Sequence, residues 1–548
     1  MVGTAPGPGT PAPRMEDRDE MKPRLLIKKM LGGMPFSADI YWLLRNRGNK
    51  FHSRFDMEAL AARLPEVMAQ VKPFSESASR GKKVFFFASW HFWIMHAALS
   101  GLTLRGLGHE VTLGYLPYSD YDEPISRFDL RRQDLYAHQI LKETQPLLKT
   151  ISLLDVRPTR ALPAELSRSV EQVAVIDTQY IRLREDVTGT EPMYLLRKER
   201  NLEAARRAFT YFREYRPDVV IVPNGMILEY GAIYKTARYL GITSVTYEFG
   251  EQDQRMWLSQ NHQVMYNESF DELWETRKNR KLNDEQRAWL EDFLAARQGL
   301  AKGEKFAHLW QKAGREGGAK IRESLGLDDR PVVLLPTNVL GDSATLGRTV
   351  FSLSMTEWIE RVVLFFANKP EVQLVIRIHP AETWTIGPSV AEIIHQVIPD
   401  LPAQIHLIGP KEEINTYDLM EIADLALVYT TTAGVEMATR GIPVLVSGRA
   451  TYRKRGFTID ADTWDDYFQK LEWILADLPA QRLSAEQIEQ AWNYAYAYFH
   501  EFTRPFPWHL EKIMADLDKR PISYVLSPEG RQKYEDTFQE LAGAPINW

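Results

Sequence analysis

Residues 425–448, LALVYTTTAGVEMATRGIPVLVSG, contain the pattern that decides the fold. An apolar run of strand length at 425–429 leads into three threonines and then into a stretch expected to be helical at 433–440. A second apolar run follows at 444–446. Two continuously apolar strands joined by one helix predict a parallel βαβ unit, because strands buried on both faces carry no alternating polar residues.

The same alternation extends toward the N-terminus of this unit. Further strands are expected at 332–335, 374–378 and 405–408, with helices at about 355–367, 388–397 and 415–422. Five short apolar runs alternating with helices predict a doubly wound parallel sheet.

An earlier part of the chain carries a second block of this kind. Its expected strands are 84–88, 109–115, 218–222 and 243–248, and its expected helices are about 92–107, 196–215 and 228–240. Between 120 and 190 the pattern is irregular, and only 150–156 is strand-like. The prediction is an α/β protein with two Rossmann-like doubly wound domains facing a cleft, which is the layout of GT-B enzymes.

The remaining segments are expected to be helical or disordered. Residues 1–22 are rich in Pro and Gly and predict a disordered leader, within which Met15 and Met21 are alternative starts. The expected boundaries are 1–22 for the leader, 23–80 for a helical prefix, 81–257 for the N-terminal domain, 258–328 for a helical connector, 329–462 for the C-terminal domain, and 463–548 for a helical tail that crosses back to the N-terminal domain.

Composition excludes several classes of protein. The 548 residues have a formal net charge of −6, which argues against a nucleic-acid partner. The absence of cysteine excludes disulfides, thiolate zinc sites and cysteine nucleophiles. No apolar run has the roughly 18 to 20 residues needed to span a bilayer. We therefore expect a cytoplasmic protein, with peripheral attachment to the inner face of the cell membrane left open.

Polar residues follow the strand that ends at residue 378. Ligands of parallel α/β sheets bind beyond the carboxyl ends of the strands. The imidazole of His379 can donate a hydrogen bond to a phosphate oxygen there, Arg377 adds charge, and Pro380 turns the chain away. The alternative is a buried histidine with a structural hydrogen bond.

Three hydroxyls, Thr430, Thr431 and Thr432, follow the strand expected at 425–429 and lead into a helix. Hydroxyls and N–H groups at a helix start can hold a phosphate, and Glu436 lies where it can reach ribose hydroxyls. Helix capping is the competing role for this cluster. The whole set of expected donor-binding residues is Arg377, His379, Pro380, Thr430, Thr431, Thr432, Gly434, Glu436, Asn338 after the first strand and Arg449 after the last.

The N-terminal block supplies candidates for a general base. Glu251 follows the strand at 243–248, and His91 follows the strand at 84–88. An inverting sugar transfer needs such a group to accept the proton of the acceptor hydroxyl. No GxGxxG, P-loop, GxSxG or HExxH motif is present, and no Asp-x-Asp ends a strand of the second block. Neither a cofactor nor an obligatory metal is expected.

Several of these segments resemble the capsule polysaccharide biosynthesis glycosyltransferases, a GT-B family related to bacterial Kdo transferases and more remotely to sialyl- and polysialyltransferases. They are PTNVLGD at 336–342, EWIERVVLFF at 357–366, LVIRIHPAE at 374–382, YTTTAGVEMATRGIPVLVSG at 429–448 and YRKRGFT at 452–458. The resemblance covers about 331–460 well and is thinner over the first block. The family's acidic general-base motif has no clear match.

The resemblance implies transfer of a sugar from a nucleotide-sugar donor, with CMP as the suggested nucleotide, to a capsular polysaccharide or lipid-linked acceptor. Donor binding is implied for the C-terminal domain and acceptor binding for the N-terminal domain. Alternatives on the same fold are a UDP-sugar 2-epimerase and a CDP-glycerol glycerophosphotransferase. An inactive scaffold in a polysaccharide assembly complex is a further alternative, which the intact His379 and the threonines disfavour.

Overall fold

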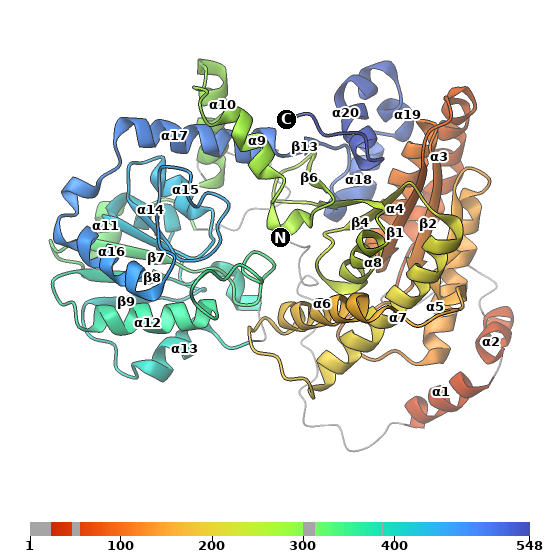
Figure 1. Ribbon diagram of the computed structural model, residues 1–548, viewed down its shortest axis with the longest axis horizontal. Coiled ribbons are helices and arrows are strands. Elements are labelled where there is room, and N and C mark those ends of the chain that lie inside the picture. Colours follow the sequence, from red (N-terminus) through yellow and green to blue (C-terminus); the bar gives the residue numbers. More distant parts are fainter. Residues whose placement is uncertain (1–22, 35, 46–54, 300–312, 385–386) are drawn as a thin grey trace.

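Two α/β domains lie side by side in a computed structural model of the chain (Figure 1). The structure describes residues 23–34, 36–45, 55–299, 313–384 and 387–548. The leader expected at 1–22 therefore lies outside the described residues.

The N-terminal domain is built on a seven-stranded sheet in the order β13-β6-β5-β4-β1-β2-β3. Strands β1 to β5 are mutually parallel, whereas β6 and β13 pair antiparallel at one edge. The order of the parallel strands reverses between β1 and β4, as in a Rossmann fold. The strands are β1 (Lys83–Ser89), β2 (Glu110–Leu116), β3 (Lys149–Ser152), β4 (Val219–Pro223), β5 (Thr243–Glu248), β6 (Arg255–Gln260) and β13 (Arg504–Pro505).

Helices cover both faces of this sheet (Figure 1). They are α3 (Glu58–Ser77), α4 (His91–Gly106), α5 (Arg127–Leu141), α6 (Ala164–Arg182), α7 (Pro192–Tyr215) and α8 (Leu228–Tyr239). Two short helices, α1 (Pro23–Gly33) and α2 (Ser37–Arg45), lie outside this layer and pack on α5.

The C-terminal domain repeats the same topology. Its six-stranded sheet has the order β12-β11-β10-β7-β8-β9, and every pairing in it is parallel. Its strands are β7 (Val332–Pro336), β8 (Gln373–Arg377), β9 (Ile405–Ile408), β10 (Leu425–Val428), β11 (Val444–Val446) and β12 (Ile459–Asp460). Its helices are α12 (Met355–Ala367), α13 (Val390–Val397), α14 (Thr416–Ile422), α15 (Ala433–Ala438) and α16 (Trp464–Ala476).

The strands of this second sheet are buried on both faces. In β7, Val332 and Leu334 join one apolar core, whereas Val333 and Leu335 join another on the opposite face. Side chains of a strand point alternately to the two faces, so an uninterrupted apolar run fits this position. The α/β class and the doubly wound GT-B architecture predicted from the sequence are confirmed.

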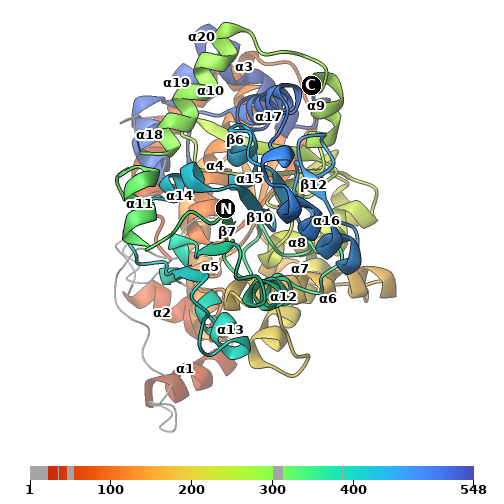
Figure 2. The same cartoon turned by 90° about the vertical axis from the view of Figure 1, so that its left-hand side faces the viewer.

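Two segments link the domains. The connector forms α9 (Phe270–Arg277), α10 (Asp284–Arg297) and α11 (Gly318–Ser324). In the tail, α17 (Ala485–Tyr496) packs on α10 and α15, and the chain then reaches the N-terminal sheet as β13. The last helices, α18 (Ile513–Lys519), α19 (Ile522–Val525) and α20 (Pro528–Leu541), lie beside α3 and α4 of the N-terminal domain (Figures 1 and 2).

Three local features differ from the sequence-based expectation. Strand β6, RMWLSQ, was not predicted, and it crosses the boundary expected at residue 257. Its burial is mixed because it is an antiparallel strand near the sheet edge. The strand expected at 150–156 ends at Ser152, whose hydroxyl accepts a hydrogen bond from the Leu154 N–H and starts a 3₁₀ turn. The irregular region at 120–190 contains α5 and α6.

Candidate functional site

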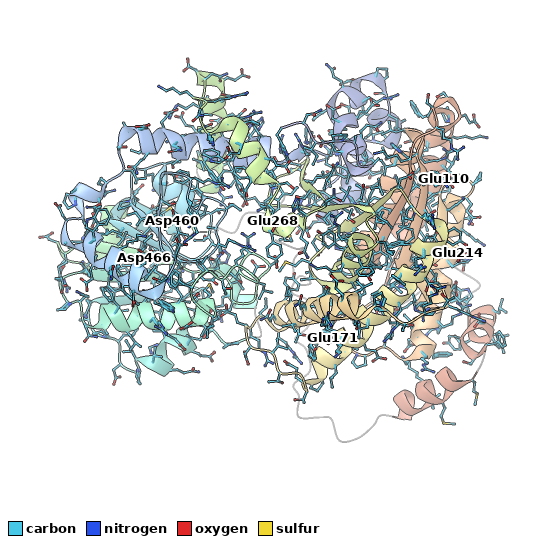
Figure 3. The ribbon with its side chains drawn as sticks, viewed as in Figure 1. Glu110, Glu171, Glu214, Glu268, Asp460 and Asp466 are labelled. Atoms are coloured by element: carbon cyan, nitrogen blue, oxygen red, sulfur yellow. The ribbon has the colours of Figure 1, made fainter. Side chains whose placement is uncertain are left out.

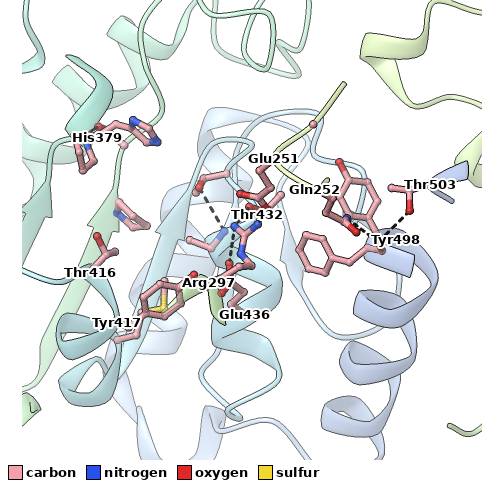
Figure 4. Close-up of a pocket in the computed structure, with 18 of the residues that line it drawn as sticks. Glu251, Gln252, Arg297, His379, Thr416, Tyr417, Thr432, Glu436, Tyr498 and Thr503 are labelled. Carbon is pink, nitrogen blue, oxygen red and sulfur yellow. Dashed lines mark hydrogen bonds and ion pairs between the residues drawn. The ribbon is translucent and has the colours of Figure 1, made fainter. Parts of the chain in front are cut away.

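A cavity lies at the carboxyl edge of the C-terminal sheet, between the two domains (Figure 4). It is bordered by the ends of β7, β8 and β10, and the strand order reverses between β7 and β10. Doubly wound sheets bind their ligands at this position. The lining combines residues of four parts of the chain. It includes Thr337, Arg377, His379, Pro380, Thr431, Thr432 and Glu436 of the C-terminal domain, Glu251 and Gln252 of the N-terminal domain, Arg297 of the connector, and Tyr498 and Phe499 of the tail.

His379 is held in one orientation and one tautomer. Its backbone N–H donates to Thr337 Oγ1 at 3.0 Å, and its Nδ1 accepts from the Ala381 N–H at 3.1 Å. Burial lowers the pKa of His379 to about 4, against which the nearby Asp342 carboxylate acts only weakly. The ring is therefore neutral at pH 7, and because Nδ1 accepts, the proton is on Nε2. A neutral imidazole with a defined Nε2–H is a hydrogen-bond donor.

The structure separates the three threonines into two groups. The Thr430 N–H donates to Asn338 Oδ1 at 3.2 Å, and its hydroxyl donates to the Ala344 carbonyl at 2.9 Å. Thr430 therefore ties its loop to the segment after β7, and neither Thr430 nor Asn338 lines the cavity. Thr431 and Thr432 do line it, so they are the two hydroxyls placed to meet a ligand.

Gly434 supports this loop by leaving room for Tyr452. A Cβ at residue 434 would lie 2.6 Å from the Tyr452 hydroxyl oxygen. That hydroxyl donates to the Thr431 carbonyl at 2.6 Å. Any side chain at residue 434 would displace it, so the glycine fixes the threonine loop indirectly and does not itself line the cavity.

Arg297 joins three parts of the chain inside the cavity (Figure 4). It lies at the end of α10, forms an ion pair with Glu251 of the N-terminal domain, and contacts Glu436 of α15 at 3.2 Å. Its Nη2 also donates to Thr432 Oγ1 at 3.3 Å, and its guanidinium carbon lies 5.1 Å from the centre of the Phe499 ring. Glu436 Oε2 has no hydrogen-bond partner among the described residues. The guanidinium of Arg297 is thus shared between two carboxylates of the cavity lining.

Two of the expected donor-binding cations have structural contacts. Arg377 borders the cavity, but its two Nη atoms donate to the carbonyls of Gly409 at 2.5 Å and Glu412 at 3.2 Å. It holds the loop after β9. Arg449 does not line the cavity, since its Nη2 donates to the Gly347 carbonyl at 3.2 Å and its guanidinium stacks on Tyr266.

The two candidate bases lie in different surroundings. Glu251 lines the cavity on the wall opposite His379, and its side chain is 12% exposed. His91 is the first residue of α4, packs against Phe55 and Phe92, and is not among the lining residues. Burial lowers the pKa of His91 to about 4. The structure brings Glu251, but not His91, to the cavity.

Residues 295–496 match the model of a family described as capsule polysaccharide biosynthesis protein. The match covers less than half of the chain. The matched segment contains five residues of the cavity lining, Arg297, His379, Thr431, Thr432 and Glu436. Glu251 also lines the cavity but lies outside the matched segment. The match confirms the assignment suggested by the sequence motifs. A search of curated proteins found no match.

Solved structures that resemble this chain do so at low sequence identity. The β-Kdo 2,4-transferase KpsC of Thermosulfurimonas dismutans is 15% identical, with a TM-score of 0.32, over 50% of this chain and 79% of its own. UDP-GlcNAc 2-epimerase of Neisseria meningitidis is 12% identical, with a TM-score of 0.26, over 77% and 99%. MurG of Acinetobacter baumannii is 13% identical, with a TM-score of 0.25, over 80% and 100%.

Arg297, Tyr498 and Phe499 are among the lining residues that the sequence analysis did not propose. Arg297 lies in a Lys-, Glu- and Ala-rich connector whose charges all look solvent-exposed in sequence. Tyr498 and Phe499 lie in a π-helical turn, Ala497–Glu501, and the Phe499 carbonyl accepts from Gln252 Nε2 at 2.8 Å. Single π-turns occur often at functional sites. The high content of aromatic residues in the tail was the only sequence feature that could have indicated Tyr498 and Phe499. Aromatic residues of this kind more often belong to a hydrophobic core.

Proposed function

We propose that this protein is a glycosyltransferase that moves a sugar from a nucleotide-sugar donor to a polysaccharide or lipid-linked acceptor. One observation carries the proposal: a single interdomain cavity at the point of strand-order reversal brings together His379, the Thr431 and Thr432 hydroxyls, Arg297 and, on the opposite wall, Glu251. Hydrogen-bond donors on one wall and a carboxylate on the other suit a donor phosphate and an acceptor hydroxyl.

The donor phosphate binds on the C-terminal wall. His379 Nε2–H and the hydroxyls of Thr431 and Thr432 donate to phosphate oxygens, and Arg297 supplies positive charge. Glu436 accepts from the ribose hydroxyls with its oxygen that has no partner among the described residues. Arg297 and the three hydrogen-bond donors balance the charge of the phosphate, and the proposed reaction uses no resident metal. CMP is the nucleotide that the family resemblance suggests.

Donor binding also prepares the acceptor side. Arg297 contacts both Glu251 and Glu436, and a phosphate competes with Glu251 for it. Glu251, once released, accepts the proton of the acceptor hydroxyl. The acceptor oxygen then bonds to the anomeric carbon as the bond between that carbon and the phosphate oxygen breaks. The negative charge that develops on the leaving phosphate is stabilised by His379, the two threonines and Arg297.

Substitution of the donor-wall residues tests the proposal. His379→Ala and the double variant Thr431→Val/Thr432→Val are each expected to weaken nucleotide binding about tenfold or more, because hydrogen bonds to charged groups contribute roughly 1.5–3 kcal/mol. Isothermal titration with CMP, CDP, UDP and GDP identifies the nucleotide on the wild-type protein and measures the loss on the variants.

His406→Ala is the matched control, since His406 lies on β9 of the same sheet but outside the cavity lining. It should bind as the wild type does. Unchanged affinity in both donor-wall variants would contradict the site. Release of free UDP from a UDP-sugar without an acceptor would identify an epimerase instead, and turnover of CDP-glycerol alone would identify a glycerophosphotransferase.

The contribution of His379 to the affinity for a nucleotide sugar is expected to be nearly independent of pH between about 6 and 8. His379 has its pKa lowered to about 4, so it stays neutral throughout this range, and the phosphodiester groups of the donor do not titrate. A histidine with the ordinary pKa of about 6.5 would become charged and strengthen binding as the pH fell toward 6. Titrations at pH 6, 7 and 8 distinguish the two cases, and a rise in affinity toward pH 6 that disappears in His379→Ala would contradict the assignment.

A further inference from the structure

The N-terminal helices α1 and α2 expose an unusual concentration of large apolar side chains. Seven such residues lie between positions 27 and 44, and they make up half of the exposed large hydrophobic residues in the described part of the chain. Phe36 is 74% exposed and Leu44 is 73% exposed. The seven residues, here called the apolar face, are Ile27, Met30, Met34, Phe36, Ile40, Leu43 and Leu44.

The apolar face follows the helical period. In α1, Ile27 and Met30 are three residues apart, and Met34 follows just after the helix; in α2, Ile40 is followed by Leu43 and Leu44 at three and four residues. Residues at these spacings share one side of a helix. The apolar side of a helix normally packs against the protein core. Exposure of the apolar face to solvent therefore indicates an interaction surface.

Other side chains anchor the two helices to α5 with the apolar face outward. Lys28 pairs with Asp129 at 2.8 Å, and Arg131 pairs with Asp39 at 3.1 Å. The Tyr41 ring packs edge-on against Phe128 at 5.5 Å between centroids. The residues of α1 and α2 that contact α5 are therefore different from those of the apolar face. Both helices lie at the outer edge of the N-terminal domain (Figures 1 and 2), and Figure 1 shows them away from the C-terminal domain.

Charge distinguishes this segment from the rest of the molecule. Residues 23–45 contain four basic residues, Arg24, Lys28, Lys29 and Arg45, and one acidic residue, Asp39, in a chain of formal net charge −6. Acidic side chains such as Glu110, Glu171 and Asp460 lie on both domains (Figure 3). A basic segment on an acidic protein, combined with an exposed apolar helix face, suits a surface that is both apolar and anionic.

We propose that α1 and α2 form a membrane-binding surface that lies in the interface of a bilayer containing anionic lipid. The apolar face enters the boundary between headgroups and acyl chains, and the net positive charge of residues 23–45 attracts anionic lipid. Attachment is in the plane of the interface, because α1 and α2 have 11 and 9 residues and no helix of the described residues is long and apolar enough to cross a membrane. Residues 1–22 offer only Met1, Val2, Met15 and Met21 as large apolar side chains, too few to cover this face. The proposal does not depend on the proposed function.

Vesicle co-sedimentation of the full chain tests this surface. The wild-type protein is expected to bind phosphatidylcholine vesicles that contain about one quarter phosphatidylglycerol, and to bind vesicles of phosphatidylcholine alone far more weakly. The variant Ile27→Ser/Met30→Ser/Leu43→Ser/Leu44→Ser is expected to lose binding by about tenfold or more, because interfacial binding scales with buried apolar area. Raising the salt to about 0.5 M should weaken wild-type binding.

A matched variant keeps the test specific. Leu195→Ser/Leu353→Ser/Leu364→Ser/Trp473→Ser removes four exposed large apolar residues elsewhere and should bind vesicles as the wild type does. Thermal melts verify that both variants are folded. Failure of the wild type to bind anionic vesicles, or equal binding by the α1–α2 variant, would overturn the proposal. A different result would also overturn it: a wild-type protein that does not bind vesicles but is dimeric, together with an α1–α2 variant that is monomeric. The apolar face would then be covered by a second copy of the chain.

Discussion

Glu251→Gln is expected to lower the turnover number by about 10² to 10⁴-fold, the range that a positioned general base contributes. Glutamine has nearly the same size as glutamate, and its side-chain oxygen can still accept from Arg297, but it cannot take up the acceptor proton. Glu251 is the candidate base that lines the cavity, on the wall across from the donor groups. The donor affinity should stay the same or rise while the rate falls, because a neutral amide competes less than a carboxylate with the donor phosphate for Arg297.

Initial rates at saturating donor, together with calorimetric titration of the nucleotide, separate these two effects. Glu268→Gln is the control, because Glu268 pairs with His262 and does not line the cavity. A rate within about threefold of the wild type would remove Glu251 from the base role and leave it only its contact with Arg297. A parallel loss of donor affinity would show that Glu251 acts by orienting Arg297.

Arg197→Met is expected to lower the free energy of unfolding of the N-terminal domain by about 3–5 kcal/mol. Arg197 is fully buried, and it donates from Nε to Asp177 at 2.6 Å and from Nη2 to Glu229 at 2.7 Å. Methionine fills part of the same volume but leaves two buried carboxylates without their cation. Since the three residues lie on α6, α7 and α8, their network holds these helices together.

Urea unfolding followed by tryptophan fluorescence and by circular dichroism measures this loss, and two probes are needed because a chain of two domains need not unfold in one step. Arg206→Met on the same helix is the control: Arg206 is exposed and contacts Glu203 at 3.5 Å, so at most about 1 kcal/mol is expected. Equal effects of the two substitutions would show that the buried network contributes no more than a surface pair.

Much of the fold follows from local sequence patterns. The continuous apolar runs at 84–88 and 332–335 correspond to β1 and β7, because a strand buried on both faces has no place for a polar residue. Strand β6 was not predicted because its alternating burial gives a weak apolar signal. In α6, by contrast, Leu166, Val170 and Val173 are spaced as in a helix, so the signal was present within a region that otherwise looked irregular.

The candidate site was only partly accessible from the sequence. The sequence by itself determined the architecture and placed His379 and the threonines at strand ends of one sheet, since the carboxyl ends of parallel strands meet at one edge. Only the tertiary structure decided that Thr430 faces Asn338, that Arg377 holds a neighbouring loop, that His91 lies away from the cavity and that Arg297 reaches two carboxylates from different domains. The physical reason is that periodicity is encoded by neighbours along the chain, whereas the partner of a polar side chain depends on how distant segments pack.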